Sequence, residues 1–102
     1  MPLVREALQR LERELAVARQ ESAAVLKVVH GYGSTGEGGE IRIAVQKRLL
    51  EMKAGGQIRG CIFGENWAKS GEDAWKLLQS NAELKSDRDL GRGNRGITVV
   101  LL

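Results

Sequence analysis

The sequence is poor in the residues that build disulfide scaffolds and metal sites. Its 102 residues include one cysteine (Cys61), one histidine (His30) and one proline (Pro2). A lone cysteine cannot close an internal disulfide, and one cysteine with one histidine cannot supply the ligands of a structural zinc site. We therefore expect no structural metal, and we expect Cys61 to be a small buried apolar residue.

Long apolar runs are also lacking. No stretch approaches the roughly 18 consecutive apolar residues of a membrane-spanning helix. The first 15 residues carry charges at helical spacing, so they lack the continuous apolar segment of a signal peptide. We expect a cytoplasmic protein with no membrane contact. The net charge of +3 permits binding to nucleic acid without requiring it.

The hydrophobic pattern predicts one α/β domain. A chain of 102 residues with a hydrophobic share of 42% can build one modest core. Periodicity and turn residues predict a helix, strand, helix, strand, short helix and strand in residues 3–20, 25–30, 40–54, 57–63, 72–80 and 96–102. Residues 64–95 form an excursion between the last two strands. With three strands only, one sheet edge is expected to be open.

The most informative stretch runs from Val25 to Gly39. An apolar strand, interrupted only by Lys27, is expected to be buried on both faces and to end at His30. Five glycines follow in residues 31–39, before the second helix. Backbone N–H groups at such a helix start can contact an anion, and Ser34 and Thr35 add hydroxyl groups. The alternative is a flexible connection at the edge of the sheet.

Two known phosphate-binding motifs do not fit this loop. No lysine follows its last glycine, as a P-loop requires. No acidic residue ends a suitable second strand, as a dinucleotide-binding fold requires.

In the strand predicted over residues 57–63, Gly60 indicates a bulge or a close backbone approach.

Two short motifs together resemble the small MutS-related (Smr) domain. That family has a His-Gly-x-Gly loop after its central strand and ends in a glycine turn followed by Gly-x-Thr-x-Val-x-Leu. The matching residues here are His30, Gly31 and Gly33 in the loop, and Gly93, Gly96 and Thr98 near the end, with Asn94 where a second glycine is usual. The resemblance implies a two-layer α/β sandwich with a small mixed sheet, βαβαββ without its first strand, over residues 1–102.

The resemblance also implies a function. Members of the family bind nucleic acid, and several nick DNA or cleave RNA. The family's first strand carries a Leu-Asp-x-His motif implicated in cleavage, and only Met1 and Pro2 precede the first helix here. Tyr32 stands at a loop position where the family often has lysine. Binding of DNA or RNA is therefore the leading hypothesis. Endonuclease activity is left open, with His30 as general acid or base and a divalent ion as its cofactor.

An arginine-rich connector, residues 87–95, precedes the last strand. If that strand lies antiparallel beside residues 25–30, its start falls at the end of the sheet where the glycine loop begins. Arg92 and Arg95 would then flank His30 and contact phosphate groups independently of sequence. The alternative is a solvated turn in which the arginines pair with their own neighbours, Asp87 and Asp89.

Other residues allow rival interpretations. We expect Trp67 and Trp75 to pack the excursion rather than to stack on bases, while Glu65 could position an ion or a substrate hydroxyl. A protein-interaction module is one rival function, in which the open sheet edge accepts a strand from a partner or from a second copy in a homodimer. Another is a small-ligand enzyme that holds a phosphate group in the glycine loop.

Overall fold

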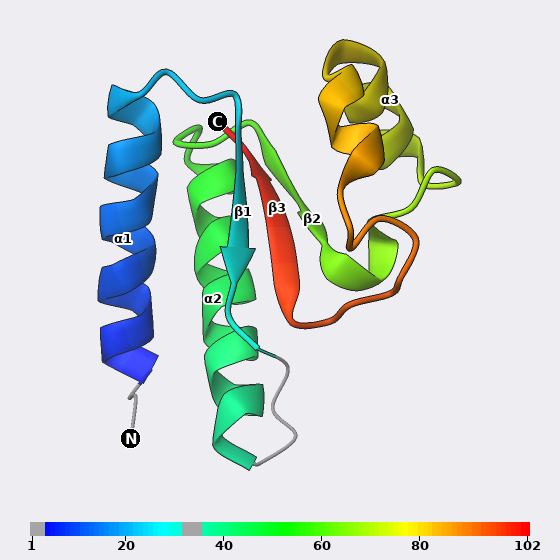
Figure 1. Cartoon of the computed structure of the whole chain (residues 1–102). Coiled ribbons are helices and arrows are strands. Elements are labelled where there is room, and N and C mark those ends of the chain that lie inside the picture. Colours follow the sequence, from blue (N-terminus) through cyan, green and yellow to red (C-terminus); the bar gives the residue numbers. More distant parts are fainter. Residues whose placement is uncertain (1–3, 32–35) are drawn as a thin grey trace.

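The computed structural model describes residues 4–31 and 36–102, and for residues 36–38 only the backbone (Figure 1). The helices are α1 (Val4–Gln20), α2 (Gly36–Ala54) and α3 (Glu72–Ser80), the strands are β1 (Val25–Val29), β2 (Gly60–Phe63) and β3 (Ile97–Leu101), and two 3₁₀ turns are η1 (Gly64–Asn66) and η2 (Ala82–Ser86). The element order predicted from the periodicity is confirmed. Gly33, Ser34 and Thr35 lie outside the described residues.

The three strands form an antiparallel sheet in the order β1-β3-β2. β3 pairs with both neighbours, so that Thr98 faces Val28 on one side and Phe63 on the other. The prediction of a mixed sheet is wrong for the described strands, because both pairings are antiparallel. β1 and β2 are joined across α2 and run in the same direction, but β3 inserts between them and runs opposite to both.

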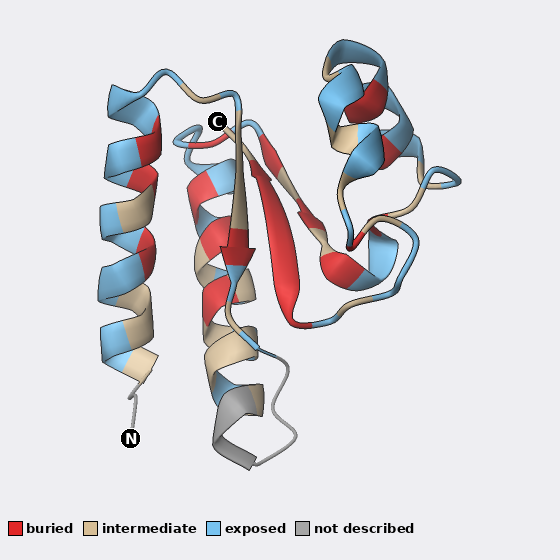
Figure 2. Cartoon of the chain, in the orientation of Figure 1, coloured by how far each residue is buried: buried red, intermediate tan, exposed pale blue. Residues whose placement is uncertain are grey.

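The sheet carries an apolar core on each face (Figure 2). Side chains alternate along a strand, so Val28 and Val100 face α1 and α2, whereas Ile97 and Val99 face the excursion. The first core also contains Leu11, Leu15, Val45, Leu49, Met52 and Ile58, and the second contains Ile62, Trp67, Ala74, Leu77 and Leu78. The expectation of two layers is therefore corrected to three, because residues 64–95 cover the second face.

The position of β1 differs from the expectation. It is an edge strand rather than a strand buried on both faces, and the Val29 side chain is 70% exposed. β3 takes the central place instead, and its residues from Ile97 to Val100 are all buried, as predicted for the last strand. The β-branched residues of β3 contribute to both cores, as expected for a central strand, and β1 forms one edge of the sheet.

The second helix begins earlier than predicted. α2 starts at Gly36 rather than near Glu40, so the last glycines of the expected loop belong to a helix. Glycine lowers helix stability by only about 1 kcal/mol relative to alanine, and the first N–H groups of a helix need no helical partner. β2 is also shorter than predicted and begins at Gly60.

The close backbone approach expected at Gly60 occurs four residues later. A Cβ atom built on Gly60 would meet nothing within 4 Å. A Cβ atom on Gly64 would lie 1.7 Å from the carbonyl oxygen of Asn94 and 2.8 Å from that of Ile97. Gly64 therefore lets η1 pack directly on the backbone that enters β3.

This contrast gives a matched pair of substitutions. Gly64→Ala is expected to lower the free energy of unfolding by about 3 kcal/mol, because two backbone segments would have to separate. Gly60→Ala is expected to stay within about 0.5 kcal/mol of the parent, since its methyl group meets open space. Urea unfolding of the two variants measures both values, and equal losses would contradict the packing described for Gly64.

Candidate nucleic-acid interface

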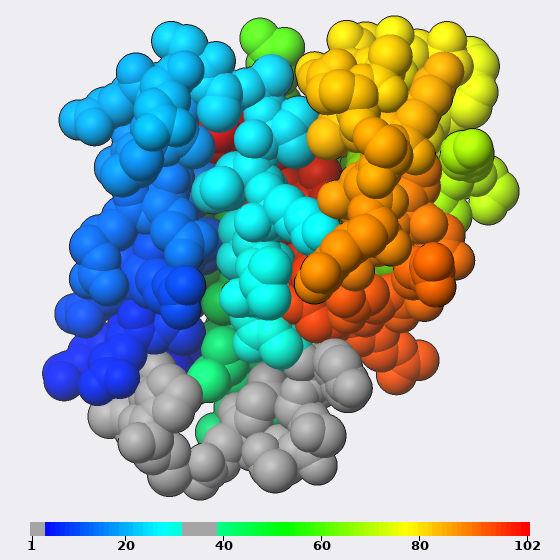
Figure 3. Space-filling model, viewed as in Figure 1, coloured from blue at the N-terminus to red at the C-terminus, as the bar shows by residue number. Residues whose placement is uncertain are grey.

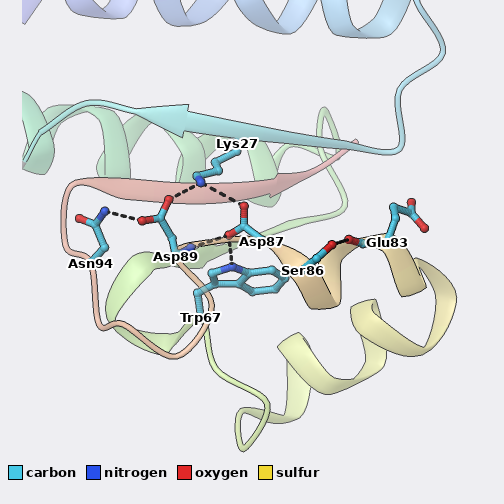
Figure 4. A network of polar contacts seen from close by, with 7 residues as sticks. All are labelled: Lys27, Trp67, Glu83, Ser86, Asp87, Asp89 and Asn94. Carbon is cyan, nitrogen blue, oxygen red and sulfur yellow. Dashed lines mark hydrogen bonds and ion pairs between the residues drawn. The ribbon is translucent and has the colours of Figure 1, made fainter.

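The connector that enters β3 is attached to β1 by a cluster of charged side chains (Figure 4). The Lys27 ammonium group contacts Asp87 at 3.1 Å and also contacts Asp89. The indole Nε1–H of Trp67 donates to Asp87 at 2.9 Å. Because Trp67 is buried in the second core, these contacts join the edge strand, the connector and that core.

A second set of hydrogen bonds continues from this cluster to the start of β3. The side-chain amide of Asn94 donates to Asp89 at 2.9 Å, and the Gly96 N–H donates to the Asn94 side-chain oxygen at 2.8 Å. Asn94, which stands where the resembled family usually has glycine, thus has a bonding role here. Gly93 has a positive φ of 63°, a conformation that glycine adopts without strain. The connector is held along most of its length.

The charged groups of this cluster stabilise one another, and the one cation and two carboxylates leave a net charge of −1. Hydrogen bonds from Lys27 and Asn94 lower the pKa of Asp89. Burial raises the pKa of Asp87, but the hydrogen bonds from Trp67 and Lys27 outweigh it, so that this pKa is lowered too. Burial lowers the pKa of Lys27, and the hydrogen bonds to Asp89 and Asp87 outweigh it, so that this pKa is raised. All three groups are therefore charged at neutral pH.

Removing the cation should leave two partly buried carboxylates without compensation. Lys27→Met is expected to lower the free energy of unfolding by about 2 kcal/mol, less than for a fully buried pair because the Lys27 side chain is 29% exposed. Adding Asp89→Asn to Lys27→Met should restore part of the loss by removing one uncompensated charge. Chemical unfolding measures both variants. A single variant as stable as the parent would show that the cluster does not hold the connector.

The backbone joins the end of β1 to the start of β3. The N–H groups of His30 and Gly31 both donate to the carbonyl oxygen of Gly96, each at 3.0 Å. Gly31 has a positive φ of 78°, which suits the turn away from the strand. The predicted proximity of the histidine and the glycine turn before the last strand is thus present. We call this end of the sheet, comprising His30, Gly31 and Gly96, the β1–β3 rim.

The imidazole of His30 has partners on both nitrogens. Its Nδ1 lies 2.6 Å from the Gly31 carbonyl oxygen, and its Nε2 lies 2.9 Å from the Thr98 hydroxyl oxygen. A carbonyl oxygen only accepts, so the proton of the neutral ring belongs on Nδ1, and the Thr98 hydroxyl donates to Nε2. Thr98 is fully buried. The motif threonine therefore fixes the histidine ring and is not exposed to a ligand.

Arg42 and Glu65 lie close enough to His30 to influence its titration. The Arg42 guanidinium contacts the two Glu65 carboxylate oxygens at 3.2 and 3.4 Å, and thereby joins α2 to η1. Burial is the main cause that lowers the pKa of His30, and the charge of Arg42 adds to it. The hydrogen bond to Gly31 and the charge of Glu65 act in the opposite direction. His30 is therefore neutral at pH 7.

The titration of His30 predicts a pH dependence of stability. Because the pKa of His30 is lowered in the folded protein, the unfolded chain takes up a proton at a higher pH than the folded protein does. The free energy of unfolding should fall between pH 7.5 and pH 5.5. His30 is the one histidine in the chain, so this slope should be lost in His30→Gln. A slope that persists in this variant would contradict the assignment.

Arg92 and Arg95 lie beside His30 in the backbone but not around its side chain. Arg95 directly precedes Gly96, and both arginines line a shallow hollow of about 420 Å³ with Asp89, Gly93 and Asn94. His30 lines a different hollow, of about 380 Å³, between α1, β1 and α2. The expectation that the arginines flank His30 is thus corrected, because the connector directs them to a neighbouring surface.

The two arginines are exposed and have no ion-pair partner in the part of the chain that the structure describes. The alternative, in which Asp87 and Asp89 neutralise them, is not what the structure contains, since Lys27 occupies both carboxylates. Sequence reasoning noted Lys27 only as an interruption of the strand. A single charged residue in an otherwise apolar strand indicates a partner of opposite charge nearby, and Lys27 gave this signal.

The tryptophans and the cysteine differ in how far they are buried. Trp67 is 1% exposed and packs the excursion as predicted, whereas Trp75 is 54% exposed, so that part of the prediction is wrong. Cys61 is partly buried against the first core, and burial raises the pKa of its thiol. Among the side chains of residues 4–31 and 39–102, no three His, Cys, Asp or Glu groups lie close enough together to hold a metal ion.

Comparison with protein-family models, with curated proteins and with solved structures found no match to this chain. None of the described helices combines the length and the apolar composition needed to cross a bilayer. The resemblance to the Smr domain is therefore a hypothesis that rests on the two glycine motifs.

Proposed function

We propose that this chain binds the phosphate backbone of nucleic acid through Arg92 and Arg95, beside the β1–β3 rim. One observation carries the proposal: Asp87 and Asp89, the acidic neighbours of these arginines, are already paired with Lys27. The connector thus presents two guanidinium groups that form no ion pair with these two carboxylates. Guanidinium groups bind phosphate with paired N–H donors, and such contacts are independent of base sequence.

The ordered backbone of the connector supports the same proposal. Hydrogen bonds from Asn94 and Gly96, and the close packing of Gly64, keep the backbone near Arg95 in one conformation. A ligand therefore meets a connector whose backbone is already ordered, which lowers the entropy lost on binding. Only the two arginine side chains remain to be ordered.

Base recognition has less support than contact with phosphate. The Trp67 ring is buried and donates to Asp87, so it has no free face for a base. Trp75 is exposed, but it belongs to α3, whereas the arginines belong to the connector that enters β3. The proposal is therefore binding with little preference for sequence, and it covers DNA and RNA alike.

We do not extend the proposal to strand cleavage. Both ring nitrogens of His30 are engaged, one by the Gly31 carbonyl and the other by the buried hydroxyl of Thr98. A general base needs a nitrogen that can reach the proton it removes. The arrangement favours a histidine that shapes the end of β1 over one that takes part in hydrolysis.

The salt dependence of binding tests the proposal. For a duplex, each phosphate contact contributes about 0.9 to the slope of the logarithm of affinity against that of salt concentration. The double variant Arg92→Ala/Arg95→Ala should therefore reduce the slope by about 2, as measured by fluorescence anisotropy with a short labelled duplex. A labelled single strand serves for comparison.

A matched control removes the same charge elsewhere. Lys53 and Arg59 are exposed and line a hollow beside the start of β2, which pairs with the opposite end of β3. Lys53→Ala/Arg59→Ala should change the slope much less than the connector variant does. Equal effects of the two double variants would indicate a response to net charge alone and would overturn the proposed site.

A further inference from the structure

The outer edge of β1 has unpaired backbone groups. The Gly96 carbonyl accepts from His30, and the Ala24 carbonyl accepts from Leu102, so the even-numbered residues of this segment exchange hydrogen bonds with β3. In an antiparallel ladder the alternate residues direct their N–H and C=O groups away from that neighbour. The groups of Val25, Lys27 and Val29 therefore point outward, and no described strand pairs with them.

This edge is also open at the surface. In the space-filling view β1, in cyan, lies uncovered between α1, in blue, and the orange segment that leads to β3 (Figure 3). The helices and the excursion cover the two faces of the sheet but not this border (Figure 1). Val29, at the end of the strand, is the most exposed of the large apolar side chains in the described chain. An open apolar edge of this kind accepts another strand.

We propose that the occupant of this edge is β1 of a second copy of the chain, paired antiparallel about a two-fold axis through Lys27. In this register Val25 lies opposite the partner's Val29, and Leu26 lies opposite the partner's Val28. The outward N–H and C=O groups of both strands then satisfy each other. The two three-stranded sheets become one six-stranded antiparallel sheet.

The sequence of the strand favours a second copy over an unrelated strand. Around Lys27 the segment Val25–Val29 is apolar in both directions, so that the symmetric pairing places aliphatic side chains opposite aliphatic side chains on both faces. A two-fold interface requires this self-complementarity, because each residue meets the symmetry-related part of the same surface. A strand of alternating polar residues would leave Val29 facing a polar group.

The central pair is the one place where like charges meet. Lys27 would lie directly opposite the partner's Lys27, an arrangement that is normally destabilising. Here each ammonium group already contacts two carboxylates, those of Asp87 and Asp89. The two facing cations are therefore each compensated within their own protomer, and the register is electrostatically permitted.

Sedimentation equilibrium over a concentration series tests this inference. The parent chain is expected to form a dimer, and Val29→Lys should raise its dissociation constant about tenfold or more, because it places a charge opposite the partner's Val25. Ile43→Lys is the matched control. Ile43 is also an exposed aliphatic residue, but it belongs to the helix α2 and not to the strand, and its substitution should leave the dimer unchanged.

Amide hydrogen exchange gives a second readout, which can be measured on the parent chain and on the Val29→Lys variant. In the dimer the N–H groups of Val25, Lys27 and Val29 should be as protected as those of Leu26 and Val28. In Val29→Lys the odd-numbered amides should exchange faster. A monomeric parent with unprotected odd amides would overturn the proposal. Protected odd amides in a monomer would overturn it too, since another segment of the same chain would then cover the edge.

Discussion

The ion pairs between Lys27 and the two aspartates of the connector fix the position of the connector on the edge strand of the sheet. They hold residues 64–95 against the second face of the sheet and so complete the core around Trp67. Partly buried ion pairs contribute little net stability, because desolvation offsets much of the attraction. Their main effect is on position: they decide where the connector lies and which charges remain free on it.

The central place of β3 explains the two surfaces to which we assign functions. Because β3 pairs on both sides, its first residues meet the end of β1, and the arginines before it reach the β1–β3 rim. The same arrangement leaves β1 with a neighbour on one side only. The phosphate surface and the open edge thus have one origin, although each can be tested without the other.

The sequence predicted the elements well and their arrangement less well. Hydrophobic periodicity identified α1, α3 and β3 because each buries a regular stripe or run. It could not show that β3 lies between the other strands, since strand order depends on contacts between distant residues. Gly60 and Gly64 illustrate this limit of sequence-based prediction. Both lie at an end of the same strand, but only Gly64 packs against the Asn94 backbone.

The candidate site was predicted in part for the same reason. An antiparallel last strand places Gly96 beside His30, and this follows from topology alone. The partner of Asp87 and Asp89 depends on which side chains the fold brings near them, and the sequence offered only the neighbouring arginines as an alternative. Lys27, about 60 residues away in the sequence, contacts both carboxylates because the fold brings the connector beside the middle of β1. A net charge of +3 therefore says little about binding, whereas the pairing of each carboxylate decides which cations can still meet a phosphate group.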